Sequence, residues 1–401
     1  MWRHVKQAEN WIIVLSAAGI LLVTMGLRQS LGLFIKPITQ TTSLTVEALS
    51  LALAIGQFTW GAIQPFSGAL ADRYGASRIL SIGILVMAFG FAVAPLLLSD
   101  FGLIISLGIL IAMGSGASSF SVLMGATAQR LAPEARATAS GVINAGSSFG
   151  QFIFAPITQT LINALGWVNA LFTMAALTLS ALPLVKSVTG ATNTQVPTPT
   201  NDTGLWSNVK TALRNPNYWL LNAGFFTCGF HVAFLVTHLP GEVNLCGLPP
   251  SVASWSLGLI GLSNIFGSLF AGWCVSRYRS KYILAIMYAS RAVLIIWYLM
   301  MPRVEWMYYA FAIGLGFTWL ATVPPTAALV GTLFGVRYMA TLFGILVFSH
   351  QVGGFFGAYL GGKALTAFGD FTWMWYADMG LALMAALVNL PIKEAPITKA
   401  P

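Results

Sequence analysis

The stretch GALADRYGASRIL (68–80) occurs twice in this chain in related form, and the weaker copy, GWCVSRYRSK (272–281), begins 204 residues later. Two further segments superimpose at an offset of 203 residues. GLRQSLGLFIKP (26–37) matches GFHVAFLVTHLP (229–240), and GVINAGSSFGQFIFAPITQTLINALG (141–166) matches GILVFSHQVGGFFGAYLGGKALTAFG (344–369). Because three separate segments agree to within one residue, we interpret the chain as two duplicated halves.

The composition is that of a membrane protein. Of the 401 residues, 57% are hydrophobic and 8% are charged, whereas soluble proteins carry about 25% charged residues. Hydrophobic windows of about 20 residues predict transmembrane helices. The predicted spans are 11–35, 47–70, 78–98, 101–129, 136–163, 166–187, 217–239, 250–274, 282–301, 305–332, 338–365 and 371–392. We therefore expect an all-α integral membrane protein, with twelve helices in two pseudo-symmetric six-helix bundles.

A polar stretch separates the two halves. The run TGATNTQVPTPTNDTG (189–204) is too poor in apolar residues to bury itself, which is typical of a linker. We divide the chain into a first half at 1–187, a linker at 188–215 and a second half at 216–401. The segment TGLWSNVKTALRNP at the end of the linker predicts a short amphipathic helix on the membrane surface. The first hydrophobic run has no small-residue cleavage site after it, so we expect a retained helix.

The net charge of +9 reflects membrane topology rather than nucleic-acid binding. Fifteen Lys and Arg residues fall in loops on the side of the amino terminus, against three (Lys36, Arg303 and Lys363) on the other. Basic loops face the cytoplasm, so both termini are predicted to be cytoplasmic, in a bacterial-type inner (plasma) membrane. The three cysteines show no metal-ligand spacing, and we expect no metal and no cofactor.

Duplicated helix bundles suit alternating access to a site between them. Here the sequence resembles a known family, because GALADRYGASRIL is similar to the signature loop of the major facilitator superfamily. The resemblance covers nearly the whole chain and implies that this loop helps to close the cytoplasmic side. The residues so implicated are Gly68, Asp72, Arg73, Gly75, Arg78 and, in the echo, Arg277.

Two stretches resemble monocarboxylate and oxalate/formate transporters within that superfamily. These are SLGLFIKPI (30–38) and RATASGVINAGSSFGQFIFAPI (136–157). The resemblance implies a secondary transporter that moves a small organic anion, with proton coupling as one option. The arginine that such proteins carry on the eighth helix would fall near Ser268, where this chain has no charge.

Arg28 is the most unusual residue of the first span, because an arginine inside a bilayer costs about 2.5–3.5 kcal/mol on insertion scales. A guanidinium fork binds a carboxylate through two charge-assisted hydrogen bonds. The repeat places His231 at the equivalent position, so the two groups can face each other across a cavity. Gln29 is an adjacent donor. The alternatives are a snorkelling arginine and a histidine bonded to a neighbouring helix.

His350 and Gln351 lie in the eleventh predicted helix. With His231, His350 is a candidate proton carrier, since imidazole titrates near neutral pH. Trp319 precedes Pro324 and Pro325, which are expected to kink its helix. We predict a substrate site that contains Arg28, Gln29, His231, Trp319, His350 and Gln351; packing roles are the alternative for each.

Arg291 and Asp378 are the remaining ionisable residues deep in the predicted spans. Both fall on helices that are peripheral in this fold, and an unpaired charge in lipid is costly. We predict a structural ion pair between them; contact between Arg291 and the substrate is the alternative.

Other classes of function fit the sequence less well. A proton-driven efflux antiporter for drugs or metabolites is the main alternative, although pumps for cations place a carboxylate in the first, fourth or seventh helix and this chain has none there. A receptor leaves the duplication unexplained. No phosphate-binding loop or nucleophile–base pair indicates an enzyme. We expect a monomer that contacts lipid and an organic anion, with the proton as an optional further partner and no nucleic acid.

Overall fold

The computed structural model describes residues 4–128, 130, 133–189, 203–275, 277–334 and 339–394, and within these it contains helices and no strand. The α-helices are α1 His4–Gln29, α2 Ile35–Thr41, α3 Val46–Tyr74, α4 Ala76–Val93, α5 Asp100–Leu103, α6 Ala112–Ala117, α7 Phe120–Ala128, α8 Pro133–Leu179, α9 Leu182–Thr189, α10 Thr203–Leu213, α11 Pro216–Leu245, α12 Pro250–Val275, α13 Ser280–Met300, α14 Glu305–Thr318, α15 Val323–Phe334, α16 Met339–Phe368 and α17 Thr372–Asn389. Two 3-10 helices, η1 (Leu31–Phe34) and η2 (Ala94–Leu96), and a π-helical segment, η3 (Ile104–Ile111), complete the described structure.

The predicted membrane character is confirmed by the helices themselves. Ten helical spans in the described residues are long and apolar enough to cross a bilayer. One of them, Gly141–Val188, bends at Gly166, whose φ of +76° interrupts the helix. The count of twelve crossings and the cytoplasmic position of the termini stay predictions.

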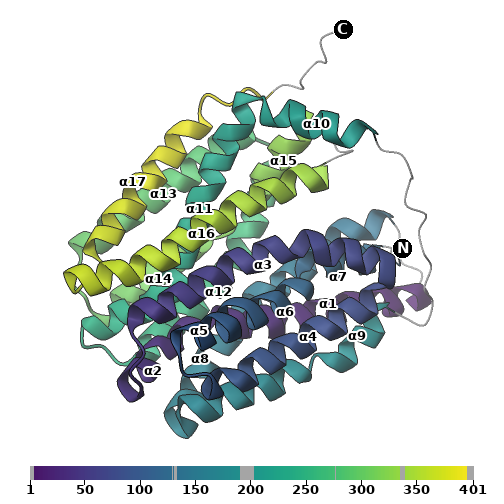
Figure 1. Ribbon diagram of the computed structural model, residues 1–401. Helices are drawn as coiled ribbons and strands as arrows, with labels where there is room; N and C mark the ends of the chain where they lie inside the picture. Colours follow the sequence, from purple (N-terminus) through teal and green to yellow (C-terminus); the bar gives the residue numbers. More distant parts are fainter. Residues whose placement is uncertain are drawn as a thin grey trace.

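The helices form two groups that lie one against the other (Figure 1). We call α1 to α9 the N-terminal group and α11 to α17 the C-terminal group. In the first, α1 packs along α8; in the second, α11 packs along α16. These are the helices that the 203-residue offset superimposes, so the duplicated sequences adopt the same pairing. The groups meet along two seams, α3 against α16 and α8 against α12.

Glycines let the two groups approach closely. A Cβ added at Gly32 would overlap the carbonyl oxygen of Val236, and one at Gly61 would overlap the Gln351 side chain. Small residues permit close helix packing in a membrane, where dispersion contacts replace the hydrophobic effect. These glycines therefore carry the contact between the groups.

The contact is uneven along the molecule. We call the end at which α10 lies the linker end, and the end formed by residues 36–45 the far end; the groups diverge toward the linker end (Figure 1). At the far end, Lys36 Nζ donates to Asn244 Oδ1 over 2.9 Å, and Lys363 pairs with Glu47 over 2.8 Å. Toward the linker end, a Cβ at Gly141 or at its repeat equivalent Gly344 would meet no atom within 4 Å. The two groups thus contact each other at the far end and diverge toward the linker end (Figure 1).

Two local predictions are tested by the helix boundaries. The segment after the polar run forms a helix, α10, as expected. The predicted linker begins before α9 ends at Thr189, and its central residues 190–202 lie outside the described structure. Pro324 and Pro325 follow a break rather than a kink, because α14 ends at Thr318 and α15 begins at Val323.

Candidate functional site

Arg28 stands in the last turn of α1, where the chain changes to the 3-10 helix η1. Its Nη2 donates to Oε1 of Gln57 over 2.7 Å, and its guanidinium carbon lies 4.7 Å from the ring centre of Trp60. Both partners belong to α3. The side chain is half-buried, and none of the described carboxylates forms an ion pair with it. The guanidinium charge is therefore available to an anion.

The side chains around Arg28 provide a further hydrogen-bond donor but leave little space for a ligand. Gln29 Nε2 points to Ser147 Oγ of α8 at 3.5 Å. A cavity of about 20 Å³ borders Arg28, Gln57 and Thr237. It has room for about one water molecule and is too small for an organic acid. A ligand must therefore reach the guanidinium from its exposed side.

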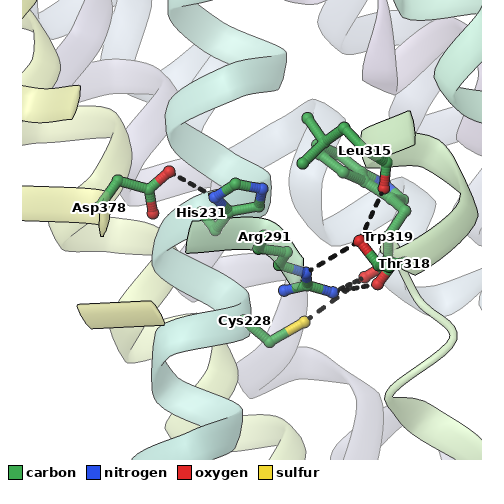
Figure 2. Close-up of polar contacts among 7 residues, drawn as sticks. All are labelled: Cys228, His231, Arg291, Leu315, Thr318, Trp319 and Asp378. Atoms are coloured by element: carbon green, nitrogen blue, oxygen red, sulfur yellow. Dashed lines mark hydrogen bonds and ion pairs between the residues drawn. The ribbon is translucent and has the colours of Figure 1, made fainter. Parts of the chain in front are cut away.

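His231 does not face Arg28 in this structure. Its Nδ1 pairs with Oδ2 of Asp378 on α17, and both side chains are almost fully buried, at 1% and 0% exposure (Figure 2). The imidazole also lies 5.9 Å from the ring of Trp319. The two residues are equivalent in the repeat, but His231 turns into its own helix group.

The predicted ion pair between Arg291 and Asp378 is wrong. Arg291 Nη2 donates instead to the carbonyl oxygens of Thr318 and Trp319, the latter over 2.5 Å (Figure 2). These carbonyls lie at the end of α14, where helical partners are missing. A cation is also favoured at a helix C-terminus by the helix dipole. Arg291 therefore caps the break, and its burial argues against direct contact with substrate.

We expect Arg291→Met to lower the stability of the folded protein by about 3 kcal/mol or more, because hydrogen bonds to charged groups contribute about 1.5–3 kcal/mol each. Thermal unfolding in detergent measures the loss. The matched control is Ser290→Ala on the same helix, whose hydroxyl bonds only to the carbonyl of Met287. Equal melting temperatures for the two variants would contradict the capping role.

Trp319 occupies the break itself rather than the middle of a helix. Its side chain is 1% exposed. Its carbonyl lies 3.7 Å from the Cys228 thiol. In this arrangement the ring packs against His231 and does not wall an open cavity.

Gln351 lies at the seam between α16 and α3, whereas the neighbouring His350 packs against Phe225 of α11. They are buried, at 9% and 3% exposure, and Gln351 Nε2 donates to His350 Nδ1 over 3.1 Å. The Gln351 side chain packs on Gly61 of α3. The contact between Gln351 and Gly61 therefore breaks when α3 and α16 separate.

The signature loop is described in part. Gly75 ends α3 with a φ of +92°, a conformation that favours glycine, so the predicted tight turn is confirmed. Gly68 has open space around it, Arg78 is exposed, and Arg277 lies 4.3 Å from the ring centre of Trp273. The side chains of Asp72 and Arg73 lie outside the described structure. The gating role of this loop stays a prediction.

Two partners of Arg28 were missed by sequence reasoning, whereas Asn264 is a polar contact that the sequence suggests in the eighth predicted span. Gln57 and Trp60 lie in a predicted membrane span. A polar glutamine inside an apolar span is unusual, as Arg28 is, and could have indicated a functional residue. Asn264 accepts from the backbone N–H of Leu320 in the α14–α15 break, over 2.9 Å, and donates to Ser148 Oγ of α8 over 2.8 Å. Asn264 therefore links the break to the other helix group. In the part of the chain described here, no group of His, Cys, Asp or Glu has the arrangement of a metal site.

Comparison with known proteins agrees with this architecture. A sequence model of the Major Facilitator Superfamily matches residues 17–358. The chain is 23% identical to the uncharacterised MFS-type transporter YcxA of Bacillus subtilis, over 88% of each protein. It is 24% identical to monocarboxylate transporter 13 of Rattus norvegicus, over 98% of this chain and 95% of that protein. It is 22% identical to the oxalate:formate antiporter of Oxalobacter formigenes, over 90% and 86%.

The fold also matches a solved structure. A bacterial homologue of the human lysosomal transporter Spinster, in an inward-facing and unoccupied conformation, superimposes with a TM-score of 0.71. The match covers 96% of this chain and 95% of that one, at 14% identity. The family model extends over most of the chain, and the helices pair as the duplication requires. The chain therefore belongs to the major facilitator superfamily, a family of membrane transporters that are not enzymes.

Proposed function

We propose that this transporter moves a small organic anion of the monocarboxylate class by alternating access. The observation that carries the proposal is the guanidinium of Arg28, half-buried between helices and without an acid partner among the described residues. An unneutralised cation at that depth is costly unless an anion compensates it. A carboxylate accepts the paired hydrogen bonds that the guanidinium offers.

The neighbours of Arg28 fit a small ligand with few polar atoms. Gln29 and Gln57 supply amide groups on two different helices, α1 and α3. Gln351 at the α3–α16 seam and the adjacent His350 are candidate contacts when the groups rock, whereas His231 and Trp319 pack inside the C-terminal group. We place anion recognition mainly in the N-terminal group.

The named relatives support the substrate class. Among the proteins that resemble this chain are a monocarboxylate transporter and an oxalate:formate antiporter, and both names describe carriers of small carboxylates. Both buried carboxylates of the described spans already have partners: Asp378 pairs with His231, and Glu242 of α11 accepts a hydrogen bond from the Tyr298 hydroxyl over 2.5 Å. Neither is free in the way that a cation-exchanging acid would be. Anion transport is therefore favoured over efflux of cationic drugs.

The proposal includes the topology. The halves at 1–187 and 216–401 rock about a site near the middle of the membrane, and the linker lies on the cytoplasmic side with both termini. The linker end, toward which the groups diverge, then corresponds to the open side of an inward-facing state. We expect a monomer in a bacterial-type inner membrane.

An uptake screen in proteoliposomes tests the substrate class. Radiolabelled formate, lactate, pyruvate and oxalate are offered with and without an imposed proton gradient. We expect saturable uptake of at least one of the acids. Failure of all four, together with export of a lipophilic cation, would overturn the proposal.

A further inference from the structure

A second polar cluster is buried inside the C-terminal group, on helices other than those that hold Arg28. Its members come from four elements: His231 and Cys228 from α11, Arg291 from α13, Asp378 from α17, and Trp319 from the α14–α15 break (Figure 2). All five side chains are at most 1% exposed. Such groups are expensive in a membrane and are usually functional.

The two ring nitrogens of His231 differ in their partners. Nδ1 faces the Asp378 carboxylate, so it carries the hydrogen and donates it. Nε2 has no hydrogen-bond partner among the described residues. A carboxylate that accepts from one ring nitrogen fixes the tautomer, so the other ring nitrogen keeps its lone pair and can act as a base. The same carboxylate stabilises the imidazolium that forms when this base binds a proton. His231 Nε2 is therefore a buried base oriented for proton uptake.

His238 shows that this arrangement is specific to His231. It lies on the same helix, seven residues further along, and is also buried, at 2% exposure. Its Nε2 donates to the carbonyl of Ala358 over 2.7 Å. That partner is a neutral carbonyl, and none of the described carboxylates pairs with this ring. An imidazolium at His238 would therefore lack the counter-charge that Asp378 gives to His231.

The charges around His231 balance only when its ring is neutral. Asp378 supplies one negative charge and Arg291 one positive charge. Three other titratable groups belong to the same buried region: Cys228, Tyr288, whose ring centre lies 5.3 Å from the Arg291 guanidinium carbon, and His350 of α16, which interacts with Cys228. Protonation of His231 therefore leaves the buried cluster with an uncompensated positive charge beside Arg291.

We propose that Nε2 of His231 takes up and releases the proton that accompanies the anion, with Asp378 as its positioning residue. This rests on the proposed function, since the proton moves with the anion. The step is an acid–base equilibrium: the Nε2 lone pair binds H⁺ on one side of the membrane and the same N–H bond breaks on the other. No oxidant or further reactant takes part. The N-terminal group binds the anion, and the C-terminal group binds the proton.

Residues of the α14–α15 break connect His231 to the α8–α12 seam, so protonation of His231 can affect the contact between the two helix groups. The His231 ring packs on Trp319, and the backbone N–H of the next residue, Leu320, is held by Asn264. Asn264 in turn donates to Ser148 of the N-terminal group. A new charge at His231 repels Arg291, which caps this same break. Protonation is thereby linked to the α8–α12 seam that must change when the groups rock.

Transport assays separate proton coupling from anion binding. In proteoliposomes, we expect His231→Gln and Asp378→Asn to lose uphill accumulation of labelled lactate driven by a proton gradient. Both variants should retain exchange of labelled for unlabelled lactate, which requires no net proton movement. His238→Gln is the matched control and should retain both activities. Uphill accumulation by His231→Gln equal to that of the wild type would overturn the proposal.

A spectroscopic titration tests the same site without any substrate. Protein labelled with ¹⁵N-histidine in nanodiscs is titrated from about pH 5 to about pH 9, the range around the titration of imidazole. The His231 signals are assigned by their loss in His231→Gln. We expect the Nδ1–H tautomer at high pH and imidazolium at low pH, with mixed tautomers in Asp378→Asn.

An Nε2–H tautomer, or one protonation state throughout the titration, would overturn the proton site even if lactate is transported. Conversely, a normal titration with no uptake of any acid would leave the proton site standing and remove the proposed anion. The two proposals can thus fail separately.

Discussion

Replacing Arg28 with glutamine is expected to reduce carboxylate uptake about 100-fold or more. The variant loses a charge and a guanidinium fork, and each hydrogen bond to a charged group contributes about 1.5–3 kcal/mol, where 1.4 kcal/mol is tenfold. Gln57 and Gln29 remain but supply no charge. Initial rates of labelled acid uptake in proteoliposomes measure the effect.

Two further variants make this prediction specific. Arg28→Lys keeps the charge without the planar fork, so we expect uptake between that of the wild type and that of Arg28→Gln. Lys210→Gln removes an exposed cation of α10, away from the helices that hold Arg28, and is expected to transport at nearly the wild-type rate. Wild-type uptake by Arg28→Gln would remove Arg28 from the anion site.

Replacing Gly32 with valine is expected to abolish transport by preventing closure of the far end. A side chain at this position overlaps the backbone of Val236 and Thr237 in α11, and backbone atoms cannot move aside as a flexible side chain does. The groups must then separate there, which excludes the state seen in this structure. The arrangement that opens to the far end is accordingly favoured.

A distance measurement across the far end checks this result. Spin labels attached at Gln40→Cys and Ser251→Cys, both exposed positions, report the distance between the two groups. Cys246 and Cys274 are first replaced by serine so that they take up no label. Cys228 can stay because it is fully buried. We expect a longer distance in Gly32→Val than in the parent protein. Gly380→Val, on an exposed position of α17 with no atom within 4 Å, is the matched control. An unchanged distance in Gly32→Val would show that this glycine is not needed for closure.

Much of the fold was predictable because a bilayer imposes simple requirements. A run of about 20 apolar residues is needed to cross it, and the duplicated segments identify which helices are equivalent. The pairings of α1 with α8 and of α11 with α16 follow the same repeat. Gly75 was also predictable, because a tight turn after α3 requires a residue that tolerates positive φ.

The partners of the buried polar residues were not predictable in the same way. The repeat gives the position of His231 along α11 but not which neighbour its ring meets, and so it suggested Arg28 instead of Asp378. Arg291 binds backbone carbonyls that become free only because α14 ends at Thr318. Backbone acceptors do not appear in a sequence, so an acid was the only partner that could be named.

The measurement that tests the central claim most directly compares a small acid with its uncharged amide in proteoliposomes. Lactate and lactamide are nearly equal in size, and only the acid presents a carboxylate to Arg28. We predict saturable uptake of lactate that unlabelled lactate inhibits and lactamide does not. Equal uptake or equal inhibition by the two compounds would contradict recognition of the anion by Arg28.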